Sequence, residues 1–349
     1  MSAWTDFLLA RGASFDGPAV ADFGDPDGEL VAARDAAVAC DLGPLAALRV
    51  SGADAATFLQ GQLTSDVDAL EPGSLHLSAW CSPKGRVLAN FMLRRIDADG
   101  FELLLPRLLL ESVQRRLTMF VLRSKVAIHD ASDATIRIGI GGPAAAQCIA
   151  AAIGIAPALH RSTAIEGGAM AGLPGSRFIA FLEPLHAASL WHRLGAVCAA
   201  GFPCWRWLTI RAGVPMILPS TQDRFIPQMI NLDALGAVSF QKGCYTGQEI
   251  VARTQYLGRL KERLALAHGN TVAEPSERLY APSFGDQPCG TVLNAGAAPG
   301  GGADLLLVAQ IAAIAAGELR TGSQDGAALT LLPLPYAAPT PATPQGRIA

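Results

Sequence analysis

Residues 241–258 read Gln-Lys-Gly-Cys-Tyr-Thr-Gly-Gln-Glu-Ile-Val-Ala-Arg-Thr-Gln-Tyr-Leu-Gly. Within this stretch, Thr246 and Glu249 stand three residues apart, directly before an apolar pair, which is the spacing of a helical capping box. We therefore expect a helix that begins at Thr246. Cys244 lies two residues before that start, so the positive end of the helix dipole and the charge of Lys242 would both favour its thiolate.

The stretch has two interpretations. In one it forms a functional site, because an activated thiol stands beside a helix start that can bind an anion. In the other it is a turn shaped by Gly243 and Gly247 around a cysteine that is simply buried. The residues of the stretch fit both interpretations equally.

Length and composition describe a well-packed protein of two or three domains. The chain has 349 residues, of which 50% are hydrophobic and 16% charged. Its formal net charge of -3 gives no global electrostatic reason to bind nucleic acid. The apolar runs are too short to cross a membrane, and the N-terminus lacks the pattern of a signal peptide. We therefore expect a cytoplasmic protein with no membrane partner.

The cysteines and histidines do not predict a metal site. The seven cysteines include no C-x-x-C pair, and the six histidines are dispersed without a partner four residues away. This spacing fits neither a disulfide framework nor a zinc site. Most of the cysteines lie in apolar contexts, whereas Cys244 has a polar setting flanked by glycine and close to lysine.

The order of predicted elements indicates an α+β protein. A strand, a helix, a hairpin, a further helix and a strand follow one another between residues 46 and 129, as in a split β-α-β, ferredoxin-like unit. A helix from Glu29 to Cys40 is expected before this unit. Residues 135–200 show a similar succession of strands and helices. Residues 260–334 have the short alternating strands of a small barrel or sandwich.

These patterns divide the chain into four parts. We predict a first α+β domain over residues 1–130 that contributes to a central pocket. A second α+β domain, residues 131–258, carries the stretch quoted above. A C-terminal β-barrel follows over residues 259–336, and the proline-rich residues 337–349 are predicted to be a disordered tail.

Two further groups of side chains could bind a ligand. Trp205 and Trp207 lie close to Phe202 and could stack on a flat heterocycle, although aromatic core packing explains them as well. Four basic residues that follow the quoted stretch could receive a polyanionic tail, although such runs are often a solvated face. They are Arg253, Arg259, Lys261 and Arg263.

Four stretches together resemble a known family. Phe240–Glu249, with the string Lys-Gly-Cys-Tyr-Thr-Gly-Gln-Glu, is similar to the signature of the YgfZ family of folate-binding proteins. The other stretches that agree with this family are Phe58–Val67, Cys81–Arg86 and Phe225–Leu232. The resemblance covers residues 40 to 335.

The resemblance implies both a fold and a function. The fold would be similar to the T-protein of the glycine cleavage system, a folate-dependent aminomethyltransferase, with two ferredoxin-like units around a central pocket and a C-terminal β-barrel. Tetrahydrofolate or another reduced folate would be the cofactor. The implied function is assembly or repair of iron–sulfur clusters in client enzymes, including enzymes that modify tRNA. Implied partners are folate and iron–sulfur client or assembly proteins, without direct contact to nucleic acid.

The resemblance also assigns roles to residues. The reactive cysteine and lysine of the family's motif correspond to Cys244 and Lys242, which would be catalytic. No metal ligands are implied. The implied folate contacts are Trp205, Arg211, Asn90, Gln228, Tyr245 and Arg253.

The chain departs from the family pattern at a few positions. Aminomethyltransferases carry acidic residues where this chain has Ala89 and Asn90, and neither can act as a carboxylate. We therefore do not expect a typical aminomethyltransferase, although a folate-dependent one-carbon transferase remains the alternative. Relatives often have glutamate at the position of Arg211 and a second tryptophan near Leu45. An arginine cannot accept a hydrogen bond from a pterin, so a protein scaffold without folate is a third possibility.

Overall fold

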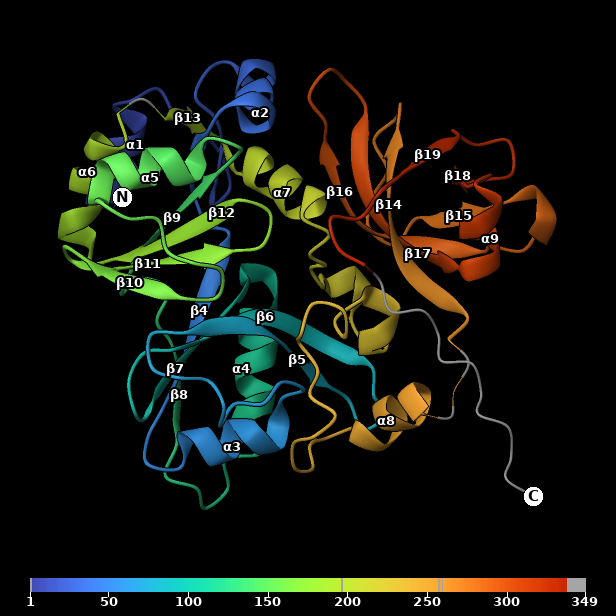
Figure 1. Ribbon diagram of the computed structural model, residues 1–349, viewed down its shortest axis with the longest axis horizontal. Coiled ribbons are helices and arrows are strands. Elements are labelled where there is room, and N and C mark those ends of the chain that lie inside the picture. Colours follow the sequence, from blue (N-terminus) through green and yellow to red (C-terminus); the bar gives the residue numbers. More distant parts are fainter. Residues whose placement is uncertain (1, 196, 257, 259, 338–349) are drawn as a thin grey trace.

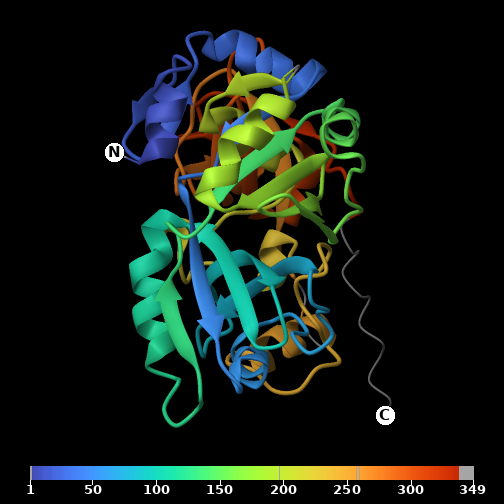
Figure 2. The same cartoon turned by 90° about the vertical axis from the view of Figure 1, so that its left-hand side faces the viewer.

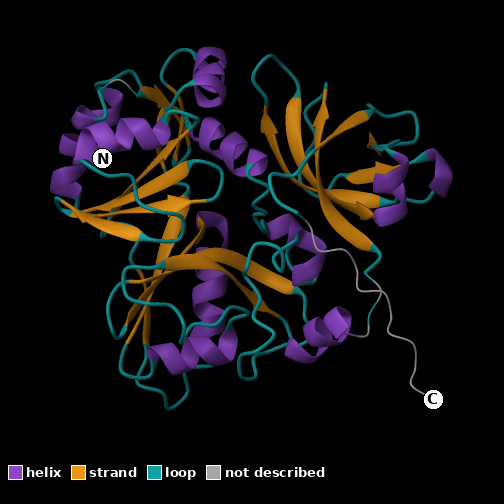
Figure 3. Cartoon of the chain, viewed as in Figure 1, coloured by secondary structure: helices purple, strands orange, loops and turns teal. Residues whose placement is uncertain are grey.

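The computed structural model describes residues 2–195, 197–256, 258 and 260–337. Its elements gather around three sheets of five or six strands, and a small hairpin of β1 (Ser14–Asp16) and β2 (Ala19–Asp22) lies near the N-terminus (Figure 1, Figure 3). Apart from Ala337, the predicted tail over residues 337–349 lies outside the described residues.

The first sheet is antiparallel and carries its helices on one face. Its strand order is β5-β6-β7-β4-β8. The helices α3 and α4 bury apolar side chains such as Phe58, Leu59 and Val113 against it. This is the predicted arrangement, with one strand more than the minimal ferredoxin-like unit. The bounds are β4 (Leu45–Ser51), α3 (Ala55–Gln62), β5 (Leu75–Cys81), β6 (Val87–Arg95), β7 (Gly100–Pro106), η1 (Arg107–Leu109), α4 (Leu110–Thr118) and β8 (Ala127–Asp130).

The second sheet has six strands in the order β10-β11-β12-β9-β3-β13. Helices α1, α5 and α6 pack against it around a core that includes Trp4, Ile149 and Trp191. The bounds are α1 (Ala3–Leu9), α2 (Pro26–Asp35), β3 (Val38–Asp41), β9 (Ile136–Gly141), α5 (Ala145–Ile153), β10 (Ser162–Ile165), β11 (Gly168–Leu173), β12 (Arg177–Leu182), α6 (Pro184–Arg193) and β13 (Cys198–Ala200).

Strand β3 corrects the helix predicted from Glu29 to Cys40. The helix α2 ends at Asp35, and Val38–Asp41 pairs antiparallel with β9 and parallel with β13. All four residues of β3 are buried, so this central strand shows no polar alternation and could be mistaken for a continuation of the helix. A segment of the predicted first domain thus belongs to the sheet of the second.

The C-terminal sheet curls into a half-barrel, which agrees with the predicted T-protein-like fold. Its order is β18-β15-β16-β17-β14-β19, and the backbone N–H of Leu329 donates to the carbonyl oxygen of Leu319 at 2.9 Å, beside β18 and β19. The bounds are β14 (Glu262–Gly269), β15 (Arg278–Tyr280), η4 (Pro282–Phe284), β16 (Gly290–Ala297), β17 (Ala303–Gln310), α9 (Ile311–Ala316), β18 (Arg320–Thr321) and β19 (Leu329–Leu332).

Helix α7 (Phe202–Arg211) lies between the second sheet and the C-terminal sheet (Figure 1). Most of its residues are buried because it is covered from both sides. Trp205 packs on the backbone of β9 at Gly139, where an added Cβ would lie 2.6 Å from the indole ring. Seen from the side, the first sheet lies below the second (Figure 2). Within the described ranges no helix is long and apolar enough to span a membrane.

Candidate functional site

Four stretches that are distant in sequence meet beside the β5–β6 hairpin. We call them the motif cluster, which consists of residues 58–67, 81–86, 225–232 and 240–249. Lys242 Nζ, in the stretch 240–249, donates to the carbonyl oxygen of Leu63 at 2.7 Å, and Gly247 packs closely against the carbonyl oxygen of Ser82 in the stretch 81–86. The backbone N–H of Val87, which directly follows that stretch, donates to the carbonyl oxygen of Phe225 at 2.8 Å. The motifs quoted above therefore form one connected region.

Lys242 reaches across the motif cluster to the end of α3. Its Nζ donates to the carbonyl oxygens of Gln60, Leu63 and Ser65, each at 2.7 Å. An ammonium group has three N–H donors, so this cage uses all of them. Burial lowers the pKa of Lys242 to about 8, and the nearby carboxylates of Asp66 and Asp68 act in the opposite direction. Lys242 fixes the loop before α8 to the first sheet.

Cys244 lies at the surface of this fixed loop. It is exposed, whereas the other six cysteines are buried or half-buried. Because the carbonyl cage occupies every N–H of Lys242, the lysine has no donor left for the Cys244 thiol. The structure thus gives Lys242 a positioning role and leaves Cys244 accessible to a partner.

The helix predicted to begin at Thr246 begins two residues later. Helix α8 spans Gln248–Tyr256, and within the described residues the Thr246 side chain makes no hydrogen bond. Gly247 separates the turn from the helix with φ +83°, and an added Cβ would lie 2.4 Å from the carbonyl oxygen of Ser82. The close approach of this hairpin, which the motif alone does not reveal, displaces the helix start.

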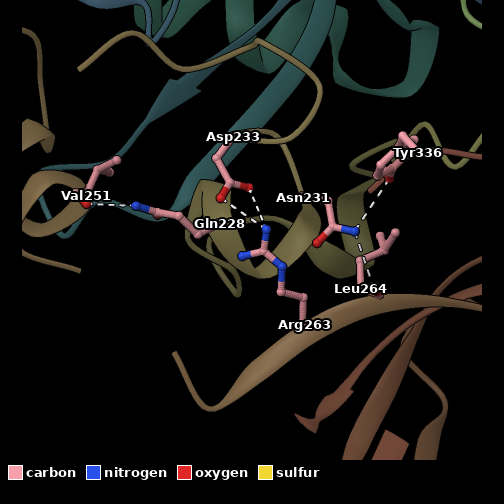
Figure 4. Close-up of polar contacts among 7 residues, drawn as sticks. All are labelled: Gln228, Asn231, Asp233, Val251, Arg263, Leu264 and Tyr336. Atoms are coloured by element: carbon pink, nitrogen blue, oxygen red, sulfur yellow. Dashed lines mark hydrogen bonds and ion pairs between the residues drawn. The ribbon is translucent and has the colours of Figure 1, made fainter. Parts of the chain in front are cut away.

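The short helix η3 (Pro227–Ile230) and the residues directly after it contact both α8 and the C-terminal sheet (Figure 4). Gln228 Nε2 donates to the carbonyl oxygen of Val251 at 2.8 Å. Arg263 Nη2 lies 3.1 Å from a carboxylate oxygen of Asp233. Other contacts drawn in Figure 4 are those of Asn231 with Leu264 and Tyr336. Gln228 therefore supports α8 from within the motif cluster.

A separate hollow lies between the first sheet, the second sheet and α7. It measures about 570 Å³, including space open to solvent. Apolar side chains form most of its wall, and the polar lining residues are Asn90, Arg177 and Thr209. Its position between the two α+β units agrees with the predicted central pocket.

Among the predicted folate contacts, Trp205 and Asn90 line this hollow. Asn90 uses both ends of its amide: Nδ2 donates to the carbonyl oxygen of Pro215 at 2.7 Å, and Oδ1 accepts from the N–H of Ile217 at 2.8 Å. Leu45 also lines the hollow. Tyr245 is buried in the motif cluster, where burial raises the pKa of its phenol above the usual range, and Arg253 is exposed on α8.

Arg211 lies outside the hollow and faces the C-terminal sheet. Its Nη1 is 3.4 Å from Oδ2 of Asp304, which also accepts from Trp207 Nε1 at 2.8 Å. The other oxygen of Asp304 lies 2.9 Å from His268 Nδ1. The predicted contact between Arg211 and a pterin is thus replaced by a contact between domains.

Arg177 lines the hollow and was not predicted. It begins β12, is 3% exposed, and holds its guanidinium carbon 5.3 Å from the centre of the Trp205 ring. The sequence does contain a signal, because a single charged residue opens the otherwise apolar run Arg-Phe-Ile-Ala-Phe-Leu. That charge has to be satisfied in the interior.

Cys244 lies near the turn of the β5–β6 hairpin, whereas the hollow lies beside the middle of β6. Gly247 and Ile250 contact Gly85 in the turn, while Asn90 lines the hollow five residues further along. At about 3.3 Å per residue, this spacing corresponds to roughly 16 Å. A flat ring in the hollow would therefore not contact the Cys244 thiol.

Comparisons with known proteins place this geometry in a family. The GCVT N-terminal domain family matches residues 18–164. A tRNA-modifying protein YgfZ from Pectobacterium atrosepticum is 35% identical over 293 residues, which cover 82% of this chain and 87% of the relative. The chain belongs to the YgfZ family. A YgfZ from Cronobacter sakazakii is 32% identical over 302 residues, covering 82% of this chain and 89% of that protein.

A solved structure confirms the fold of this YgfZ family member. The aminomethyltransferase T of the glycine cleavage system from Bartonella henselae superimposes with a TM-score of 0.75 and 15% sequence identity. The match covers 96% of this chain and 97% of that protein. The predicted T-protein-like fold is therefore confirmed.

Proposed function

We propose that this protein binds tetrahydrofolate or another reduced folate in the hollow. We further propose that it assists iron–sulfur cluster assembly or repair in client enzymes, including enzymes that modify tRNA. The observation that carries this proposal is the combination of a mostly apolar hollow with one exposed cysteine on a fixed loop. The names of the relatives support the link to tRNA modification.

The residues of the hollow fit a flat heterocycle such as a pterin. Ligand sites typically combine apolar walls with a few polar groups, and this hollow offers Arg177 beside Trp205. Arg177, Trp205 and the fixed backbone near Asn90 would hold the ring. When bound, a reduced folate supplies one-carbon or reducing chemistry.

Cys244 would supply an accessible thiol outside the hollow. Iron–sulfur clusters usually need about four protein ligands. In the part of the chain that the structure describes, no group of three or more His, Cys, Asp or Glu side chains could hold a metal ion. We therefore propose that Cys244 contacts a cluster or a client thiol transiently, with the remaining ligands coming from the partner.

The lining of the hollow argues against aminomethyl transfer as the main activity. That reaction would use a carboxylate for proton transfer or charge stabilisation. Among the described residues that line the hollow, the polar ones are Asn90, Thr209 and Arg177, and none is a carboxylate. We propose that any effect on tRNA is indirect, through cluster enzymes, since the net charge of -3 does not favour binding to nucleic acid.

A rescue experiment tests the role of Cys244. Cells that lack this protein are expected to lose activity of an iron–sulfur enzyme, and the wild-type protein should restore it. Cys244→Ser should fail, while Cys148→Ser, a change at a half-buried cysteine, should restore activity fully. Robust folate-dependent aminomethyl transfer that survives Cys244→Ser would contradict the proposal and favour a transferase.

A further inference from the structure

Arg177 differs from the other buried arginines of the described chain in having no acidic partner. Arg263 pairs with Asp233, and Arg137 interacts with the negative charges of Glu102 and Asp41. The partners of Arg177 are neutral: the carbonyl oxygen of Pro174 and the hydroxyl of Thr209. A buried charge without a counter-charge is costly, so a negative or acceptor-rich ligand would complete this site.

The guanidinium of Arg177 is held in one orientation. Nε donates to Pro174 at 2.9 Å, and Nη1 donates to Thr209 Oγ1 at 2.7 Å. The Thr209 hydroxyl in turn donates to the carbonyl oxygen of Trp205 at 2.8 Å, and the Trp205 ring lies beside the guanidinium. Nη2 makes no hydrogen bond with any described residue. Since Arg177 lines the hollow, this nitrogen can donate to a ligand there.

The other polar groups of the wall are already engaged. The amide of Asn90 is committed to the backbone at Pro215 and Ile217, and the Thr209 hydroxyl both donates and accepts. Arg177 is the charged side chain among the described residues that line the hollow. A guanidinium only donates hydrogen bonds, so it distinguishes ligands that present an acceptor from those that present a donor.

We propose that Arg177 determines specificity in the hollow by donating from Nη2 to the 4-oxo group of a pterin ring. This inference rests on the proposed folate binding. The C4 substituent of a 4-oxo pterin accepts a hydrogen bond, whereas that of a 4-aminopteridine is an NH₂ donor. The protein therefore selects 4-oxo folates and rejects their 4-amino analogues, because a site built to donate a hydrogen bond excludes a ligand that cannot accept it.

The test compares two ligands that differ at that substituent. Calorimetric titrations of the full chain use tetrahydrofolate and its 4-amino counterpart, tetrahydroaminopterin, under anaerobic conditions. The wild-type protein should bind the 4-oxo ligand at least about tenfold more tightly, as for a hydrogen bond from a charged donor. Arg177→Met should bring the affinity ratio to within about threefold of one. Thr209→Val, which removes one of the two neutral partners, should give an intermediate ratio if Arg177→Met does not fold.

Each outcome separates this inference from the proposed function. Equal wild-type affinity for the two ligands would overturn the role of Arg177 while folate binding stands. A tenfold preference that persists in Arg177→Met would do the same. If neither ligand binds at millimolar concentration, the proposed folate binding fails and the inference fails with it.

Discussion

Lys242 Nζ donates to the carbonyl oxygen of Leu63 at 2.7 Å and so links the cysteine-bearing loop to the residue that follows α3. Two further carbonyl oxygens complete the cage. Lys242, in the stretch 240–249, is thus hydrogen-bonded to the stretch 58–67, which also belongs to the family pattern. Its main effect is to set the position of Cys244.

Removing the ammonium of Lys242 should loosen the loop. Lys242→Met leaves three carbonyl oxygens without their donor, and we expect a loss of roughly 1–3 kcal/mol in the free energy of unfolding. The melting temperature should fall by several degrees, as measured by thermal circular dichroism. Lys84→Met, at an exposed lysine in the neighbouring hairpin, is the matched control. Equal melting temperatures for the two variants would contradict the positioning role.

Cys244 should be the most rapidly modified thiol of the folded protein. It is exposed, and the other six cysteines are buried or half-buried. A limiting amount of a thiol reagent should therefore label Cys244 first, as mass spectrometry of the digested protein would show. Cys244→Ser should abolish this fast phase, and Cys148→Ser should leave it unchanged. Fast labelling of Cys148 instead would argue against the accessible thiol.

The sequence predicted the fold well where local patterns were strong. The hairpin within residues 46–129 and the short strands of residues 260–334 follow from periodicity and turn residues. Strand β3 could not be predicted in this way, because a strand buried on both faces shows no alternation of polar and apolar residues. Its partners β9 and β13 lie about a hundred residues or more further along, so only long-range pairing fixes it.

The site was predicted in part. Asn90 and Trp205 lie in the hollow, but Arg211 does not, and helical phase explains this difference. Trp205 and Thr209 are four residues apart and share the face that lines the hollow, whereas Arg211 is two residues beyond Thr209 and faces elsewhere. Arg177 was missed because its importance depends on which residues surround it, and these come from distant segments.

Arg211 should affect stability more than ligand binding. Arg211→Glu would place a second carboxylate beside Asp304, and we expect a loss of about 1 kcal/mol in the free energy of unfolding, since the arginine is partly solvated. Folate affinity should stay within about twofold of wild type in a calorimetric titration. Arg211→Met, which is neutral, should destabilise less. A tenfold gain in folate affinity for Arg211→Glu would contradict this prediction and show that residue 211 contacts the ligand.

His76 should make the fold sensitive to acid. Burial, with a smaller effect of His160, lowers the pKa of His76 from 6.5 to about 4. Above pH 6.5 the imidazole is neutral in both states; between pH 6.5 and 4 only the unfolded chain binds the proton, so stability falls as pH falls. The loss by pH 4.5 should be about 2–3 kcal/mol.

Urea unfolding at several pH values measures this dependence. In His76→Gln the fall in the free energy of unfolding between pH 7 and 4.5 should shrink by about that amount. The exposed His129→Gln provides the control. An unchanged pH profile in His76→Gln would show that His76 is not the responsible group.

The central claim is that a reduced folate binds in the hollow, and titration of tetrahydrofolate tests it most directly. Calorimetry should show one site per chain, with Cys244→Ser unchanged. Met92→Trp, which fills the hollow, should weaken binding at least about tenfold, while Met119→Trp at an exposed methionine should not. Absence of binding at millimolar tetrahydrofolate, or binding that Met92→Trp leaves intact, would contradict the account.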